Sequence, residues 1–179
     1  QSRDELAAEK TVFEDISGGQ DMLKVGRFEM PARSYLARFN FRGIGGSAGA
    51  WDEGRGEIDD ALAVAQALRQ GGEPLALAGF SFGAFVASHA AAALQAEPLV
   101  LIGPATQNFT VATVPQGTLV VHGEADEVVP LAATLDWARP QSLPVVVVPG
   151  GGHFFHGQLP LLKNLVVRHL QAPPQQAKL

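Results

Sequence analysis

The strongest constraint on the fold is the stretch Gly79-Phe80-Ser81-Phe82-Gly83, which has the form G-x-S-x-G. An apolar run, 75–78, precedes it, and an alanine-rich segment, 84–96, follows it. This context predicts a strand, a sharp turn and a helix, with the Ser81 hydroxyl raised at the turn. The two glycines are expected to remove Cβ atoms that would block neighbouring backbone. The start of the helix would direct free N–H groups, beginning with that of Phe82, towards a developing oxyanion.

A serine nucleophile needs a base, and the base needs an acid that orients it. Two later apolar runs, 118–121 and 145–148, lead into segments that contain Asp126 and His153, respectively. Ser81, Asp126 and His153 follow each other in the order that α/β-hydrolases use. Each also follows the end of an expected parallel strand, where open α/β sheets place their sites. We therefore expect Ser81 as the nucleophile, His153 as the base and Asp126 as the orienting acid.

Short apolar runs alternate with segments of helical period along most of the chain. Helices are expected at 53–70, 82–95, 131–139 and 158–170, and strands at 35–41, 75–80, 98–102, 118–122 and 144–148. Continuous apolar strands separated by helices are typical of a parallel sheet that is covered on both faces. The sequence thus predicts an α/β protein with a doubly wound, mostly parallel sheet.

The pattern divides the chain into three parts. Residues 1–34 form an atypical N-terminal segment, with a capping box that predicts a helix over about 3–15 and an ambiguous stretch at 17–34. Residues 35–171 form the α/β core. Residues 172–179, rich in proline and glutamine, are expected to be a flexible tail.

The connection 103–117 between two expected strands is short and contains two prolines. Many α/β-hydrolases insert a helical lid at this point of the chain, and a segment of this length cannot form one. We therefore expect an open site that favours small substrates over long acyl chains.

Composition limits the partners and the chemistry. The 179 residues suit one domain, and the net charge of -5 argues against nucleic acid or an anionic membrane as the main partner. The absence of cysteine excludes disulfides, thiol catalysis and Cys-ligated zinc. No apolar stretch approaches the ~20 residues of a membrane span, and the polar start is unlike a signal peptide, so a cytoplasmic protein is expected.

Four sequence phrases occur in the order known from one family: Arg38-Phe39-Asn40-Phe41-Arg42-Gly43, Asp52-Glu53-Gly54-Arg55-Gly56-Glu57, Ala78-Gly79-Phe80-Ser81-Phe82-Gly83-Ala84 and His153-Phe154-Phe155-His156. Through them, the chain from Tyr35 to about Arg168 resembles the small, lidless bacterial α/β-hydrolases related to dienelactone hydrolases. The resemblance implies a carboxylesterase-like enzyme in which Ser81, Asp126 and His153 are nucleophile, acid and base. Its expected substrates are small esters or lactones, with no metal or organic cofactor.

Residues 1–34 depart from this family, because they contain no histidine and hence no His-Gly or His-Pro loop to supply a second oxyanion donor. The N–H of Phe82 is expected to be the first donor. Candidates for the second lie in Ser17-Gly18-Gly19 and in Gly43-Ile44-Gly45-Gly46. We expect neither loop to place an N–H about 3 Å from the oxyanion, and hence weak turnover of simple esters. The alternative function is a weak or inactive binding or structural protein.

Strands lost from one side of the sheet would leave an unpaired edge. Such an edge must be covered, or must pair with another chain. A homodimer is therefore a further expectation.

Other side chains compete for the site. Glu124 and Glu127 flank Asp126 and are alternative orienting acids, and His156 is the alternative base. A metal held by His153 and His156 lacks a carboxylate at ligand spacing, so no metal is expected. Three further histidines are expected to be structural: His89, His122 and His169.

The stretch Gly43-Ile44-Gly45-Gly46-Ser47-Ala48 fits a loose dinucleotide fingerprint. The next helix is expected to begin only near Asp52, too late for its N-terminus to bind a pyrophosphate. Asp59 and Asp60 fall inside that helix and not at the end of a strand. We therefore interpret the stretch as a loop. The acidic group from Asp52 onwards is interpreted as a solvated helix start, and Arg42 as a partner of one of these acids.

Overall fold

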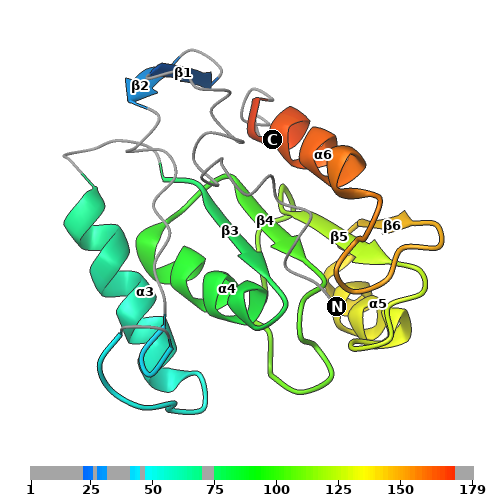
Figure 1. Ribbon diagram of the computed structural model, residues 1–179, viewed down its shortest axis with the longest axis horizontal. Helices are drawn as coiled ribbons and strands as arrows, with labels where there is room; N and C mark the ends of the chain where they lie inside the picture. The colour runs from blue at the N-terminus through cyan, green and yellow to red at the C-terminus, as the bar shows by residue number, and fades with distance from the viewer. Residues whose placement is uncertain (1–21, 26–27, 32–40, 45–46, 70–74, 172–179) are drawn as a thin grey trace. The chain divides into compact units, whose positions relative to one another are not determined.

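Two units, Gln1–Phe39 and Asn40–Leu179, make up the computed structural model. It describes residues 22–25, 28–31, 41–44, 47–69 and 75–171 (Figure 1). The expected helix over about 3–15, the tail 172–179 and most of the expected strand 35–41 lie outside the described residues.

The first unit contains a two-stranded antiparallel hairpin, β1 (Met22–Val25) and β2 (Phe28–Pro31). Met22 lies opposite Pro31, and Val25 lies opposite Phe28. The sequence pattern left this stretch ambiguous because Pro31 interrupts it. The proline closes the last strand of a two-stranded ribbon, where a missing N–H is tolerated.

A four-stranded parallel sheet forms the centre of the second unit, in the order β3-β4-β5-β6 (Figure 1). Its strands are β3 (Leu77–Phe80), β4 (Leu99–Ile102), β5 (Leu119–Gly123) and β6 (Val145–Val148). Each matches an expected strand to within two residues. Among the described residues β3 and β6 are the two edge strands of this sheet, and the pairing of an edge in a homodimer stays a prediction.

Helices cover both faces of this sheet, which confirms the doubly wound class. The helices are α3 (Arg55–Leu68), α4 (Phe82–Leu94), α5 (Leu131–Ala138) with the short 3-10 helix η1 (Arg139–Gln141), and α6 (Leu159–Gln171). Successive strand residues point to opposite faces. Val120 therefore joins the core that contains residues of α3, α4 and α5, whereas Val121 joins a smaller core against α6.

The segment 103–118 contains no helix, in agreement with the expected absence of a lid. Val111 and Val114 are buried in the larger core, which ties this connection to the body of the protein. The carboxyl ends of the strands are therefore not covered by a helix from this connection.

The carboxylates of Glu57 and Asp60 connect α3 to the residues that precede it. Glu57 is fully buried, and its carboxylate accepts the N–H groups of Asp52 and Gly54 at 2.9 Å each. This corrects the expectation that the acidic group is simply solvated. Arg42 donates from Nε and Nη2 to Asp60 at 2.9 and 2.7 Å, and these hydrogen bonds lower the pKa of the Asp60 carboxyl.

We predict that Leu101→Ala lowers the free energy of unfolding by about 2–5 kcal/mol, because Leu101 is fully buried at the centre of β4 and truncation leaves a cavity. Leu161→Ala is the matched control, since Leu161 is 46% exposed on α6 and should change stability by less than about 0.5 kcal/mol. Urea unfolding at neutral pH measures both. Equal midpoints for the two variants would contradict the packing described above.

Candidate active site

Ser81 occupies the turn between β3 and α4 in a strained backbone conformation, with φ 53° and ψ -118°. Its N–H donates to the carbonyl of Ile102 on β4 at 2.9 Å, which ties the turn to the neighbouring strand. Its own carbonyl accepts the N–H groups of Ala84 and Phe85, at 3.0 and 3.4 Å, in the first turn of α4. A non-glycine residue at positive φ costs about 1–3 kcal/mol and persists only where its surroundings hold it.

The two glycines of the motif differ in what they do. A Cβ on Gly79 would lie 2.2 Å from the carbonyl oxygen of Gly83, so only glycine lets α4 approach β3 this closely. A Cβ on Gly83 would meet nothing within 4 Å. The expectation that both glycines prevent a collision therefore holds for Gly79 alone.

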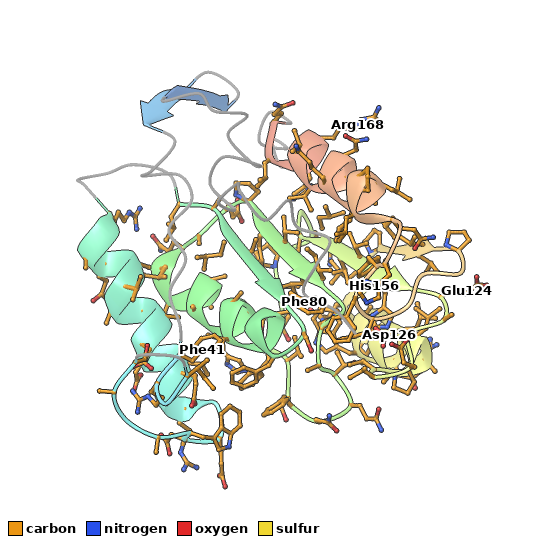
Figure 2. All side chains as sticks on the ribbon, in the orientation of Figure 1. Phe41, Phe80, Glu124, Asp126, His156 and Arg168 are labelled. Atoms are coloured by element: carbon orange, nitrogen blue, oxygen red, sulfur yellow. The ribbon has the colours of Figure 1, made fainter. Side chains whose placement is uncertain are left out.

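A continuous hydrogen-bonded chain joins the three side chains expected at the site. The Oγ of Ser81 lies 3.0 Å from Nε2 of His153, and Nδ1 of His153 lies 2.8 Å from Oδ2 of Asp126. His153 is 2% exposed, and the Asp126 side chain is completely buried. Figure 2 places Phe80 and Asp126 near the carboxyl ends of β3 and β5, the edge to which the strands point.

Asp126 stays ionised although burial favours its neutral form. Its Oδ1 accepts the N–H groups of Val129 and Val128, at 2.7 and 2.9 Å. Burial raises the pKa of the Asp126 carboxyl, but the donors from Val129, His153 and Val128 outweigh it, and the pKa lies below its usual value. The result is a negative charge held against the ring of His153.

Sequence reasoning missed a second histidine beside this acid. His122, at the end of β5, is fully buried, and its Nε2 donates to the carbonyl of Val129 at 2.9 Å. The same nitrogen lies 3.4 Å from Oδ2 of Asp126. His122 therefore positions the turn that carries Asp126. The four-residue spacing between His122 and Asp126 was the signal available in the sequence.

The two competing acids act on the histidine loop and not on its imidazole. The carboxylate of Glu124 accepts the N–H of Gly150 at 2.9 Å. The carboxylate of Glu127 accepts the backbone N–H of His153 at 3.3 Å. These bonds tie the loop after β5 to the loop after β6.

The remaining histidines lie elsewhere. His156 is exposed and its ring packs 5.9 Å from that of Phe154, so His153 is the histidine that meets Ser81. His89 hydrogen-bonds through Nε2 to the carbonyl of Thr110 at 2.9 Å. In the described part of the chain, no group of three or more His, Asp or Glu side chains is arranged to hold a metal ion.

The backbone N–H of Phe82 is the expected first donor to an oxyanion, and this role stays a prediction. Phe82 is the first residue of α4, where an N–H has no partner within the helix. The N–H groups of Gly43 and Ile44 are committed within their own loop, to the carbonyls of Ala48 and Phe41 at 3.2 and 3.1 Å. Ser17-Gly18-Gly19 and Gly45-Gly46 lie outside the described residues, so the expected lack of a second donor stays a prediction.

Solved structures with the same arrangement of elements identify the family. A lidless α/β serine hydrolase from Xanthomonas campestris, XC6422, is 42% identical over 76% of this chain and 67% of its own, with a TM-score of 0.69. The chain belongs to the lidless α/β serine hydrolases. An α/β serine hydrolase homologue from Coxiella burnetii is 38% identical over 74% of this chain and 67% of its own, with a TM-score of 0.65.

Comparison with curated sequences gives shorter matches, and no family model matches the hydrolase chain. The energy-dependent translational throttle protein EttA of Escherichia coli K12 is 42% identical over 83 residues, 43% of this chain. The uncharacterized protein RP471 of Rickettsia prowazekii is 36% identical over 87 residues, 47% of this chain. The hydrolase spans only 14% of the length of EttA and 33% of RP471, so the solved structures carry the family assignment.

Among the described residues, no helix of the hydrolase combines the length and apolar character needed to cross a bilayer.

We predict that Gly79→Ala destabilises the hydrolase by about 1–3 kcal/mol or more, because its Cβ would force α4 away from β3. Gly83→Ala is the matched control within the same motif. The Cβ added at Gly83 meets open space on a helix, so the free energy of unfolding of this variant should stay within about 1 kcal/mol of the wild-type value. Urea unfolding compares the two variants, and equal losses would show that the close approach at Gly79 does not stabilise the turn.

We also predict that Asp126 contributes to acid stability. Because its folded pKa is lowered, its contribution is complete above the unfolded value of about 3.9 and is lost as the pH falls through the folded value. The unfolding free energy of wild type should therefore fall more steeply between about pH 5 and pH 2 than that of Asp126→Asn.

The control for this measurement is Asp136→Asn, which removes a carboxylate that is 69% exposed. The steep acid fall seen for wild type should persist in this variant. Parallel profiles for wild type and Asp126→Asn would contradict a lowered pKa for Asp126.

Proposed function

We propose that the chain hydrolyses small carboxylic esters or lactones through a Ser-His-Asp triad and an acyl-enzyme. The observation that carries this proposal is the unbroken path from Ser81 Oγ through His153 to the Asp126 carboxylate, with contacts of 3.0 and 2.8 Å. A buried ionised carboxylate on one imidazole nitrogen leaves the other free to accept the serine proton. The family membership supports a hydrolase, and the geometry supports the assignment of roles.

In the first half of the reaction, Ser81 Oγ attacks the ester carbonyl while Nε2 of His153 takes the hydroxyl proton. Asp126 holds the ring in the tautomer with hydrogen on Nδ1 and stabilises the charged imidazole. The N–H of Phe82 donates to the oxyanion. His153 then returns the proton to the alcohol oxygen as the ester C–O bond breaks.

In the second half, a water molecule attacks the acyl-enzyme, with His153 again as the base. The carboxylic acid leaves, and Ser81 recovers its proton. No group other than the three side chains, the N–H donors and water is required for this cycle to balance.

A catalytically weak or inactive α/β-hydrolase-like protein is the second candidate. It is favoured by the N–H groups of Gly43 and Ile44, which donate within their own loop and leave Phe82 as the described donor. Removing one oxyanion donor typically lowers turnover by about 10²–10³. Such a protein would keep a reactive serine and turn over esters slowly or not at all.

We predict that a fluorophosphonate probe labels Ser81, because its Oγ meets the imidazole of His153 at 3.0 Å. Ser81→Ala should abolish labelling. Ser142→Gly is the control, since it removes a different, exposed serine hydroxyl at a position with φ 52° that glycine accepts. Intact-mass spectrometry measures the adduct, and an unlabelled wild type beside a labelled control esterase would overturn the proposed function.

Hydrolysis of p-nitrophenyl acetate separates the two candidates. Brisk turnover that is lost in Ser81→Ala supports the esterase with a complete oxyanion hole. Labelling without measurable turnover supports the weak or inactive alternative.

A further inference from the structure

Two exposed phenyl rings contact the imidazole of His153. The ring of Phe80, immediately before the nucleophile, lies 4.9 Å from it, and the ring of Phe154 lies 5.1 Å from it in an edge-on arrangement. The two phenyl rings lie 6.0 Å apart. Phe80 is 40% exposed and Phe154 is 53% exposed. We call this pair the phenyl platform.

The phenyl platform leaves apolar surface in water beside the reacting atoms. Exposed apolar groups that gather around a functional residue commonly mark a binding surface. Aromatic rings stack on other rings in offset or edge-to-face geometry and gain energy beyond the area that they bury. A planar apolar group is therefore the ligand that this surface fits best.

The reaction decides which end of the substrate meets the phenyl platform. His153 must deliver its proton from Nε2 to the leaving alcohol oxygen, so the alcohol part of the ester lies beside the imidazole. Phe82 packs instead within a second aromatic group, with ring distances of 4.8 Å to Trp51 and 5.1 Å to Phe109. In the proposed mechanism the Phe82 N–H donates to the carbonyl oxygen, which puts this second group on the carbonyl side.

We propose that the hydrolase selects esters whose leaving alcohol carries an aromatic ring, and that this ring binds to the phenyl platform. The proposal rests on the esterase function proposed above. In the selective step, the bond from Ser81 Oγ to the acyl carbon forms and the bond from that carbon to the arylmethyl oxygen breaks. The proton on Nε2 of His153 goes to that oxygen, and an aromatic alcohol leaves.

The test compares kcat/KM for benzyl acetate and ethyl acetate, which share an acyl group and differ in the alcohol. Wild type should prefer benzyl acetate by about tenfold or more, since burial of a ring is worth roughly 1.5–3 kcal/mol. Phe154→Ala should lower the benzyl-to-ethyl ratio by about tenfold. Phe154→Tyr, which keeps the ring, should retain the preference.

Leu161→Ala is the matched control, because it removes an exposed apolar side chain on α6 that belongs to neither aromatic group. Its benzyl-to-ethyl ratio should equal that of wild type. Two outcomes would overturn the platform assignment and leave the esterase function standing. One is hydrolysis that depends on Ser81 but shows no benzyl preference, and the other is a Phe154→Ala variant that loses both activities equally. Absence of both labelling and hydrolysis overturns the esterase function and the inference that rests on it.

Discussion

The close approach of α4 to β3 is the constraint on which the site depends. The backbone of Gly83 and Ala84 lies where a Cβ on Gly79 would have to be, so the strand must turn sharply before the helix begins. Ser81 takes up this turn with φ 53°, and its N–H is anchored to Ile102 on the adjacent strand. The strain is local, whereas the packing that maintains it involves two strands and a helix.

A buried negative charge organises the other half of the site. Asp126 would be destabilising in the interior if it lacked partners. Two backbone N–H groups and His153 satisfy it, and His122 holds the same turn through the carbonyl of Val129. The carboxylates of Glu124 and Glu127 then fasten the histidine loop from the same side. Several contacts therefore position the imidazole of His153, in addition to the hydrogen bond that its ring makes with Asp126.

The parallel sheet could be predicted from the sequence, because continuous apolar runs separated by helical periods have few other solutions. In a parallel sheet, the residues that follow the strands lie at the same edge, the one formed by the carboxyl ends. This rule alone predicts that Ser81, Asp126 and His153 lie close together. The burial of Glu57, the open space at Gly83 and the contact of His122 with the acid turn escaped prediction. Each depends on how separate segments pack in three dimensions, which composition and periodicity do not encode. The β1–β2 hairpin escaped because Pro31 is a breaker signal that a terminal strand position tolerates.

The turn supplies the nucleophile of the proposed reaction but only one of the expected oxyanion donors. Placing Ser81 directly before α4 puts the nucleophile and the Phe82 N–H one residue apart, so a single turn supplies both. In hydrolases with this kind of turn, the second donor comes from a different loop. Phe80 and Phe154 are exposed beside His153, so they exclude water there only when the ring of a bound substrate covers them. A site closed to water in this way has a lower local dielectric, which strengthens each hydrogen bond to the oxyanion. An aromatic alcohol bound on these rings would therefore strengthen the hydrogen bond from the Phe82 N–H to the oxyanion, and substrate choice and catalysis would be linked at one surface.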